Sequence, residues 1–447
     1  MDDLTRQVAT TATGRLLPTR LEAEAAQLPA ALTLAGAAAM PGTEASLMVL
    51  RDENGLLFAG PVLLSDDDGL RRARPGDGAA HALVAALAGA ASLHGAGFTT
   101  AVLVPDGSVQ MSEIGDAERP MLVDQTHESV VVAERAVVKW AVHAESTPAA
   151  VLVPHLSEAG FAAMPAPWGF VTWQDPSDPH AEPAVLVASV MDYLPEASDG
   201  WAWAVQDVGR WATGAVELRA AVGPMEALGV LVANLHVALA TPTSVIPEPT
   251  TTADAVELSR WRSLAEALLS EAVEVVDGPE GERLAALRDR VAATLATLDT
   301  AAGTVTMPVH GDLHVGQVLR WRGGYAVGDF DGNPVLPVPE RLRPQPAARD
   351  VAGMLQSLDH VGRVVVRRVE GADAALVEQW IADAQDHFLS AYRRRLAEAD
   401  SSRLLDERLL LPFRVEQECR EFLYAVRHLP RWRYVPDQAL RALFPEG

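Results

Sequence analysis

Residues 310–331 read HGDLHVGQVLRWRGGYAVGDFD. The polar side chains fall into two clusters, 310–317 and 329–331, separated by an apolar, strand-like segment that turns at Gly323-Gly324. The turn places the second cluster at the end of a short strand. Histidines, aspartates and a glutamine gathered this closely indicate a site, and we take this stretch as the part around which the fold is organised.

The spacing of the two clusters favours phosphoryl transfer, which needs a base beside the acceptor hydroxyl and oxygen ligands for Mg²⁺ on the nucleotide phosphates. Asp312 is the candidate catalytic base. Gln317, five residues later, and Asp329 are the candidate Mg²⁺ ligands. The same interval separates the catalytic Asp from the metal-binding Asn in the kinase catalytic loop, and Gln can replace Asn because only a carbonyl oxygen is needed.

Three other residues of the stretch, His310, His314 and Asp331, are candidate contacts to the substrate. The alternative interpretation is that Asp312 and Asp329 are turn carboxylates and that the histidines are local hydrogen-bond partners. The joint pattern favours the site.

Residues 310–350 resemble the catalytic region of the aminoglycoside-phosphotransferase-like kinases, and most closely that of the bacterial maltokinase branch. In that branch HGDLHxGQ is followed by DFxGxP and then by RDVAGM, and this chain has all three, the last at 349–354. The resemblance implies an α+β, bilobal, protein-kinase-like fold with an N-terminal cap subdomain and a large helical C-lobe. It also implies ATP and Mg²⁺ as cofactors, the roles given above for Asp312, Gln317 and Asp329, and a brace for the catalytic loop at Asp350.

The chain departs from the maltokinase pattern at 329–334, where it reads DFDGNP in place of the usual DFEGEP. This departure, together with the segment 416–422, EQECREF, is similar to the maltokinase-related glucosamine kinases. The resemblance therefore implies phosphorylation of glucosamine to glucosamine 6-phosphate. The alternatives are a maltokinase forming maltose 1-phosphate, an aminoglycoside phosphotransferase, and a non-catalytic binding protein.

We divide the chain into a cap subdomain, 1–110, an ATP-binding subdomain, 111–194, and a helical C-lobe, 195–447. In the second part, a polar turn at 124–129 suggests that Thr126 and Ser129 cradle phosphates; the alternative is a solvated hairpin turn. Lys139 is the only lysine among the 36 Lys and Arg residues, which suggests that chemistry retains it, because ammonium and guanidinium groups are not interchangeable at a phosphate site. The alternative is that this lysine survives by chance. In the family the passage after 184–190 is the hinge that meets adenine, which makes Val190 and Asp192 candidates for main-chain contacts.

Beyond the hinge, apolar residues recur at three- and four-residue intervals, which predicts helices. The predicted helices are Trp201–Ala221, Pro224–Ala240, Thr252–Val276, Gly278–Thr300, 350–369, 373–397 and 406–428. His236 lies on an apolar face and is predicted to be a buried, hydrogen-bonded core histidine.

In this superfamily C-terminal helices bind the acceptor. Glu416, Arg420 and Tyr424 follow one another at intervals of four and so share one helix face. With Glu421 they are the candidate acceptor residues, and a carboxylate among them would pair with the ammonium of an amino sugar. The alternative is a surface charge pattern.

The net charge of −24 argues against a nucleic-acid-binding surface, which requires a basic patch, and fits a cationic substrate. No run of about 18 apolar residues predicts a membrane span. The single cysteine, Cys419, excludes an intramolecular disulfide and is expected to pack within a helix. We expect a cytoplasmic, monomeric enzyme that acts on a small sugar.

Overall fold

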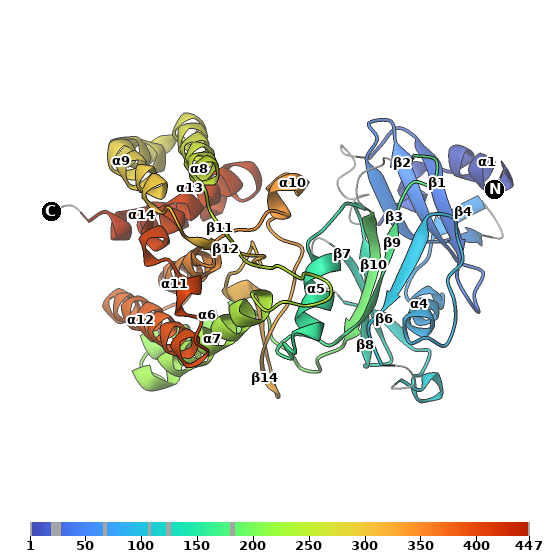
Figure 1. Cartoon of the computed structure of the whole chain (residues 1–447), viewed down its shortest axis with the longest axis horizontal. Coiled ribbons are helices and arrows are strands. Elements are labelled where there is room, and N and C mark those ends of the chain that lie inside the picture. Colours follow the sequence, from blue (N-terminus) through green and yellow to red (C-terminus); the bar gives the residue numbers. More distant parts are fainter. Residues whose placement is uncertain are drawn as a thin grey trace. The chain divides into compact units, whose positions relative to one another are not determined.

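The computed structural model describes residues 2–18, 28–65, 69–105, 109–121, 127–178 and 184–445. The chain divides into two compact units. The first consists of Met1–Pro154 and Pro165–Pro195, and the second of His155–Met164 and Glu196–Gly447. Antiparallel strands dominate the first unit and helices the second (Figure 1). This composition agrees with the expected α+β class, while the division at residues 110 and 194 stays a prediction.

The first unit contains two antiparallel sheets. The four-stranded sheet has the order β1-β2-β3-β4, in which each strand pairs with its neighbour in sequence. Its strands are β1 (Leu32–Ala39), β2 (Ser46–Asp52), β3 (Leu57–Ser65) and β4 (Gly69–Arg72). The helices α1 (Asp2–Thr10) and α2 (Thr13–Leu16) precede it, and α1 contacts β1 and β4.

The six-stranded sheet of the first unit has the order β5-β9-β10-β8-β7-β6, so β10 and β8 lie in its middle. Its strands are β5 (Phe98–Val102), β6 (Glu118–Pro120), β7 (His127–Val132), β8 (Ala136–Ala141), β9 (Pro167–Trp173) and β10 (Val185–Asp192). The apolar helix α4 (Ala79–Leu87) packs against this sheet, and Trp140, Trp168 and Trp173 are buried in the shared core. The sheet therefore holds Ser129 and Lys139 on rigid strands.

The second unit is built from long helices whose starts carry recognisable caps. Asp199, Asp254 and Asp373 each accept a hydrogen bond from the first turn of the helix that follows, as N-cap aspartates do. The long helices are α6 (Gly200–Ala212), α7 (Leu218–Leu239), α8 (Ala255–Val275), α9 (Gly278–Ala296), α11 (Ala348–Arg368), α12 (Ala374–Glu398) and α13 (Leu410–His428). The shorter helices include α5 (Ala149–Glu158), which spans the division between the units, α10 (Val338–Arg341) and α14 (Tyr434–Leu443).

One helix prediction is wrong. The segment Trp201–Ala221 forms two helices, α6 and α7, because α6 ends at Ala212 and Gly214 adopts a positive φ of 73°. The other apolar periodicities correspond to α7, α8, α9, α11, α12 and α13, with ends displaced by a few residues.

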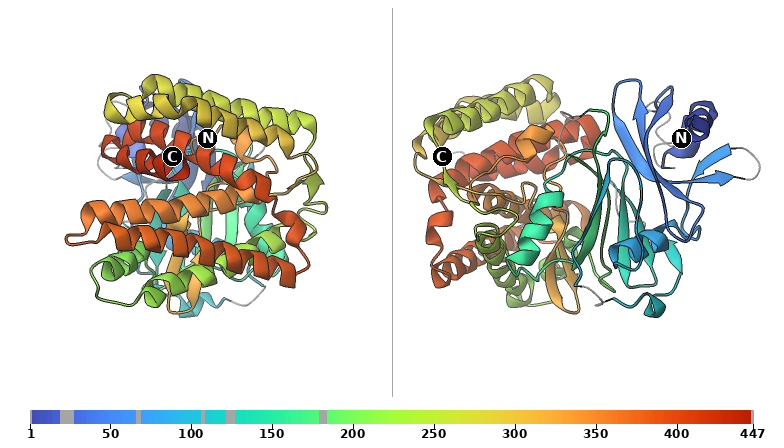
Figure 2. Two further views of the ribbon diagram at one scale, coloured as in Figure 1. Left: turned by 90° about the vertical axis from the view of Figure 1, so that its left-hand side faces the viewer. Right: turned by 45° about the vertical axis from the view of Figure 1, so that its right-hand side comes forward.

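Helices α7 and α12 lie side by side in the second unit (Figure 2). Among the described residues, α7 alone is long and apolar enough to cross a membrane, and 61% of its apolar window is buried within the protein. Burial of this kind is typical of a core helix. Cys419 is buried in α13, as expected.

The stretch 310–331 lies in the second unit. A short helical turn, Val315–Gln317, leads into β13 (Val318–Trp321), which pairs with β14 (Gly324–Val327). Trp321 opposite Gly324 closes the hairpin, and the φ of 115° at Gly324 is one that glycine adopts without strain. The hairpin brings the two polar clusters to the same end, as its sequence predicts.

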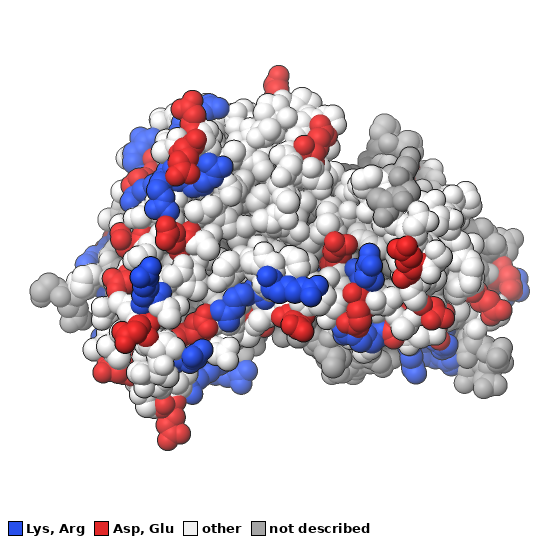
Figure 3. All heavy atoms as spheres, turned by 90° about the horizontal axis from the view of Figure 1, so that it is seen from below, with Lys and Arg blue, Asp and Glu red and all other residues white. Residues whose placement is uncertain are grey.

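Charged side chains of both signs are interspersed on the face shown in Figure 3. Among the ion pairs of the chain, exposed examples include Arg119 with Glu134 at 2.5 Å, whose side chains are 46% and 58% exposed. Exposed pairs of this kind contribute about 0 to 1 kcal/mol each, so the fold depends mainly on its apolar cores.

Candidate active site

The loop that carries Asp312 is braced from α11 by one buried carboxylate. Asp350 accepts hydrogen bonds from the backbone N–H groups of His310, at 2.8 Å, and Gly311, at 2.9 Å. His236 lies 3.2 Å from the same carboxylate and 2.6 Å from the Tyr392 hydroxyl, and all three side chains are buried. Burial alone would raise the pKa of Asp350, but the hydrogen bond from His236 and nearby positive charge hold it below its ordinary value. This confirms Asp350 as the brace and His236 as a buried, hydrogen-bonded histidine.

Two glycines allow helices to approach the backbone of the same loop. A Cβ atom at Gly200, the first residue of α6, would lie 1.5 Å from the Val315 carbonyl oxygen. A Cβ atom at Gly353 in α11 would lie 2.6 Å from the Leu313 carbonyl oxygen. A side chain at either position would push the loop away, which gives the glycine of the RDVAGM segment a physical reason.

The Asp312 carboxylate is held by a side chain from the loop that follows β14. Asn333 Nδ2 donates to Asp312 Oδ1 at 2.9 Å, and Asn333 Oδ1 accepts from the Val335 N–H at 3.0 Å. Asn333 is 5% exposed, so its amide is fixed at both ends. Burial, with the nearby charges of Asp329 and Glu421, raises the pKa of Asp312 to about 7, although His310 and Arg420 act in the opposite direction. A carboxylate with this pKa is well matched to general-base work near neutral pH.

The candidate metal ligands meet beside this base. Gln317 Nε2 donates to Asp329 Oδ2 at 3.3 Å and lies 3.4 Å from His314 Nε2, which in turn lies 4.0 Å from Asp312 Oδ2. Burial lowers the pKa of His314 to about 4, so its ring is neutral at pH 7. The structure thus brings Asp312, His314, Gln317 and Asp329 together.

Asp329 adopts a left-handed backbone conformation with φ of 60°. This conformation costs an L-residue roughly 1 to 2 kcal/mol, although Asp tolerates it better than most residues do. Strained positions of this kind concentrate at functional sites, so the strain supports a role for the Asp329 carboxylate.

The geometry argues against a direct substrate contact by His310. Its side chain is fully buried, its Nε2 lies 2.9 Å from the Gly328 carbonyl oxygen, and its Nδ1 accepts the N–H of Asp312 at 3.4 Å. His310 therefore ties the two polar clusters to each other. Asp331 is partly exposed beside them.

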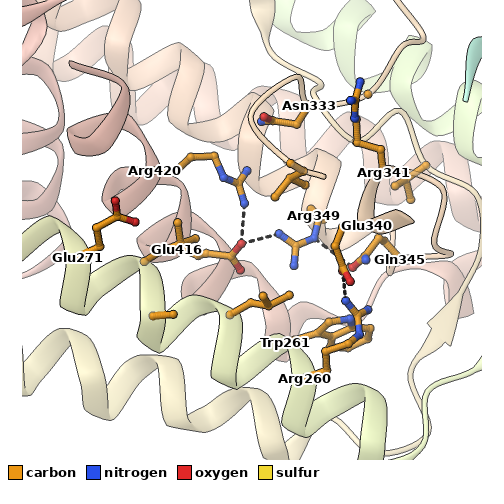
Figure 4. A pocket seen from close by; sticks show the side chains of 17 residues that line it. Arg260, Trp261, Glu271, Asn333, Glu340, Arg341, Gln345, Arg349, Glu416 and Arg420 are labelled. Atoms are coloured by element: carbon orange, nitrogen blue, oxygen red, sulfur yellow. Dashed lines mark hydrogen bonds and ion pairs between the residues drawn. The ribbon is translucent and has the colours of Figure 1, made fainter. Parts of the chain in front are cut away.

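The residues of the expected acceptor face of α13 differ in burial. Glu416 is 3% exposed and accepts from Arg349 at 2.8 Å and from Arg420 at 2.6 Å (Figure 4). The two guanidinium groups outweigh the effect of burial and hold the pKa of Glu416 below its ordinary value. Tyr424 is 42% exposed and packs its ring on His428. The single face predicted from the sequence thus runs from a buried ion-pair cluster to the surface.

Glu421, one residue beyond Arg420, has a different setting. Its carboxylate accepts from Gln417 Nε2 at 3.0 Å and from Trp432 Nε1 at 3.0 Å, and both donors are neutral. Trp432 packs edge-on against Trp201, whose ring centroid lies 6.1 Å from that of His314. Because Glu421 also influences the pKa of Asp312, this acidic and aromatic cluster lies within electrostatic reach of the base.

The candidate nucleotide residues of the first unit lie on the six-stranded sheet. Lys139 on β8 stands opposite Ser129 on β7 and opposite Ser189 on β10, so the three side chains share one face of the sheet. Thr126 lies outside the described residues.

The pairing of β10 limits the expected adenine contacts, which stay a prediction. Val190 is paired with Val138 on one side and with Gly169 on the other, and the N–H of Asp192 donates to the Ala166 carbonyl oxygen at 2.8 Å. The Asp192 carboxylate accepts from Trp168 Nε1 at 2.7 Å. The main chain of Val190 and the N–H of Asp192 are therefore already used within the sheet.

Sequence reasoning missed Asn333, Arg349, Trp201 and Trp432 as parts of this region. Asn333 was visible as a departure from the DFEGEP pattern, but its partner lies 21 residues away. Arg349 opens the RDVAGM segment, and nothing in the sequence shows that it pairs with Glu416.

No protein-family model matches the chain. The glucosamine kinase of Streptacidiphilus jiangxiensis is 48% identical over 403 residues, which cover 89% of this chain and 88% of that protein. The glucosamine kinase of Mycolicibacterium smegmatis (strain ATCC 700084 / mc(2)155) is 44% identical over 393 residues, 87% of this chain and 93% of that protein.

Solved structures agree with these relatives. A glucosamine kinase in complex with glucosamine, ADP and inorganic phosphate is 44% identical, with a TM-score of 0.81 and 99% of each chain covered. Crystal form B of a glucosamine kinase gives a TM-score of 0.84 over 99% of each chain. These similarities confirm the kinase-like α+β fold and the resemblance read from the sequence. The chain is therefore an ATP-dependent kinase and belongs to the glucosamine kinase family.

Proposed function

We propose that the chain transfers the γ-phosphoryl group of ATP to glucosamine in a Mg²⁺-dependent reaction that gives glucosamine 6-phosphate. Asp312 takes the proton of the acceptor hydroxyl as that oxygen bonds to phosphorus and the bond to ADP breaks. The observation that carries the proposal is the Asp312 carboxylate itself, raised to a pKa of about 7 and held by Asn333. Family membership and the related structure with glucosamine, ADP and phosphate support it.

Gln317 and Asp329 are the proposed Mg²⁺ ligands. Their side chains meet at 3.3 Å and offer an amide carbonyl and a carboxylate, the hard oxygen donors that Mg²⁺ prefers. Among the described residues, no group of three His, Cys, Asp or Glu side chains could hold a metal. Two protein ligands suit Mg²⁺ at a nucleotide site, because phosphates and water complete its shell. Bound Mg²⁺ would neutralise charge on the phosphates.

For the nucleotide we retain Lys139 and Ser129, which share a face of the six-stranded sheet, and Thr126 of the preceding turn. An ammonium group is suited to the phosphates as a compact point charge. The monomeric state and the cytoplasmic location remain proposals.

For the ammonium of the acceptor, the hydrogen-bond partners favour Glu421 over Glu416. Two guanidinium groups already compensate Glu416, whereas the partners of Glu421 are neutral and leave its negative charge available. A charge-assisted hydrogen bond to the 2-ammonium group would then select an amino sugar. Trp432, His314 and Trp201 beside Glu421 supply the aromatic surface on which a sugar ring can pack. This setting favours glucosamine over maltose, the acceptor of the alternative.

The experiment that tests the function is an ADP-release assay of the wild type with glucosamine, glucose, maltose and an aminoglycoside. We expect the highest kcat/KM with glucosamine and a 6-phosphate as the product, identified by NMR. A preference for maltose would contradict the proposal and support the maltokinase alternative. Absence of ADP release with every sugar would contradict it and support a non-catalytic binding protein.

The Glu421→Gln variant should lower kcat/KM for glucosamine by about 10- to 150-fold, because it removes a charge-assisted hydrogen bond of about 1.5 to 3 kcal/mol. Glucose lacks the ammonium and should lose much less. The quantity to measure is the glucosamine-to-glucose ratio of kcat/KM, in which general damage to the fold cancels. An unchanged ratio in this variant would refute the pairing.

The matched control is Glu416→Gln. This change breaks a buried ion-pair cluster and should cost about 3 to 5 kcal/mol of stability, since it leaves two guanidinium groups without their carboxylate. Both sugars should be affected alike, so the ratio should stay at its wild-type value. A ratio that narrows in Glu416→Gln alone would exchange the roles of the two glutamates.

The pH dependence follows from the raised pKa of Asp312. Only the deprotonated carboxylate can accept a proton, so kcat/KM should fall as pH drops below about 7, by about tenfold per pH unit. Measuring the profile with glucose, which carries no titrating amine, assigns this limb to the enzyme. A flat profile between pH 5 and pH 7 would contradict Asp312 as the base.

A further inference from the structure

A buried histidine–glutamate pair lies next to the aromatic residues of the candidate acceptor site. His360 of α11 is 3% exposed, and its Nε2 lies 2.9 Å from Oε1 of Glu418, a fully buried residue of α13. A buried ion pair usually stabilises a protein no better than well-packed apolar side chains of the same volume would. The proposed reaction gives neither residue a role, so stability and chemistry leave the pair without a function.

Glu418 fixes the His360 ring in one orientation. Its Oε1 also accepts from Gln356 Nε2, and Gln356 stands one turn before His360 on α11, so two side chains of that helix meet at the same carboxylate oxygen. Burial alone would lower the pKa of His360, but Glu418, together with Glu421 and Asp359, raises it to about 9. The ring is therefore protonated at pH 7, and it cannot turn without breaking a charge-assisted hydrogen bond in the protein interior.

The fixed ring of His360 packs against the indole of Trp432. The two rings meet edge to face, with centroids 6.1 Å apart and an interplanar angle of 88°, an arrangement that aromatic pairs prefer. Trp432 ends a short 3₁₀ turn, Pro430–Trp432, between α13 and α14, so it does not belong to a long helix that would hold its backbone. The contacts of its side chain therefore decide where the indole lies.

The indole of Trp432 in turn determines the position of the Glu421 carboxylate. Trp432 Nε1 donates to Glu421 Oε2 at 3.0 Å, and Gln417 Nε2 donates to the other oxygen, Oε1, at 3.0 Å. A displaced indole would release Oε2 and leave the carboxylate to the hydrogen bond from Gln417. Besides burial, the charge of His360 is one of the effects that lower the pKa of His314, so the ring lies within electrostatic reach of the site.

We propose that His360 is a positioning residue for the sugar acceptor: it holds Trp432 in place, and Trp432 directs Glu421 toward the amino sugar. The proposal rests on the function given above and deepens it. His360 and Glu418 are buried, so they act through Trp432 rather than by contact with the sugar. Loss of the ring should weaken acceptor binding and leave the chemical step intact, since the hydrogen bond on the Asp312 carboxylate is unchanged.

The His360→Gln variant removes the ring and keeps an amide that can donate to Glu418. KM for glucosamine should rise by about threefold to tenfold, the loss expected when an aromatic contact no longer fixes a binding residue. Steady-state kinetics should show kcat within about twofold of wild type, because a positioning residue of the acceptor acts on binding. A folded His360→Gln variant with the KM of wild type would overturn the proposal.

The matched control is His155→Gln in α5. His155 is also fully buried and lies within hydrogen-bond distance of the Thr243 hydroxyl and the Leu239 carbonyl oxygen. The control should lose stability, as measured by thermal unfolding, but keep the wild-type KM for glucosamine. An equal rise of KM in both variants would show that loss of a buried histidine affects KM through general damage, and the proposal would fail.

A second variant keeps the proposal testable if His360→Gln does not fold. His360→Leu combined with Glu418→Gln replaces the charged pair by neutral side chains, and the amide oxygen at 418 can still accept from Gln356 Nε2, so the fold should be preserved. The ring is absent here as well, and KM for glucosamine should rise by the same factor. A stable double variant with wild-type KM would show that the pair serves only the core.

A double-mutant cycle tests whether His360 acts through Trp432. Trp432→Ala removes the indole, so adding His360→Gln in that background should change KM by less than about twofold, whereas independent effects would multiply. Multiplied effects would overturn the proposal. Glucosamine turnover by wild type separates these outcomes from a failure of the proposed function, which would abolish that turnover before any variant is compared.

Discussion

The Asp312→Asn variant is expected to lower kcat by about 10² to 10⁴, the range that a positioned general base contributes. The amide has the shape of the carboxylate, and its oxygen can still accept from Asn333 Nδ2, so the catalytic loop should keep its structure. Affinity for ADP should remain close to that of wild type, because the change removes a proton acceptor and leaves Gln317 and Asp329 in place. Steady-state kinetics with glucosamine and calorimetry with ADP measure the two quantities.

Asp289→Asn is the matched control, since Asp289 is an exposed residue of α9 outside the candidate site. It should have wild-type turnover. Turnover of Asp312→Asn close to wild type would show that another group takes the proton, and a parallel loss of ADP affinity would show that Asp312 serves mainly the nucleotide.

The catalytic loop was predictable because its determinants are local or lie in one recognisable segment. Asp312, Gln317 and Asp329 are joined by a hairpin whose turn carries two glycines, so the spacing alone implies that they meet. Asp350 could be named as a brace because it stands in the first turn of α11, where its carboxylate reaches the N–H groups of His310 and Gly311.

The sequence alone could not decide which glutamate of α13 binds the acceptor. Glu416 and Glu421 lie on the same helix and look equivalent in sequence, yet their partners differ in charge. Of the two guanidinium groups that neutralise Glu416, Arg420 is local, but Arg349 lies 67 residues away and no local pattern encodes its contact. Periodicity likewise placed Tyr424 with Glu416, although Tyr424 is 42% exposed and Glu416 is buried.

The predicted adenine hinge shows that a sequence can identify a strand without revealing how that strand is paired. The sequence indicated a strand at 184–190, and β10 is that strand, but only the strand order reveals that it has paired neighbours on both sides. Backbone groups in the middle of a sheet are consumed by the ladder, so a ligand contact by the main chain requires an edge or a strand end.

The second large effect is expected at Asp329, where Asp329→Ala should abolish the Mg²⁺-dependent part of nucleotide binding. Its carboxylate is the charged member of the Gln317–Asp329 pair, and an amide alone is a weak Mg²⁺ ligand. Calorimetry with ADP, with and without Mg²⁺, should show an effect of the metal in wild type and none in the variant.

The backbone of Asp329 allows loss of the carboxylate to be separated from damage to the fold. Glycine adopts the φ of 60° without strain, so Asp329→Gly removes the carboxylate and should leave the free energy of unfolding within about 1 kcal/mol of wild type. Asp400 also has a positive φ, of 54°, and is exposed at the end of α12, which makes Asp400→Gly the matched control with full activity. If Asp329→Gly is folded and inactive while Asp400→Gly is active, the carboxylate at 329 serves the reaction rather than the turn. If ADP affinity in Asp329→Gly still responds to Mg²⁺ as it does in wild type, the metal is held elsewhere and the assignment of Asp329 fails.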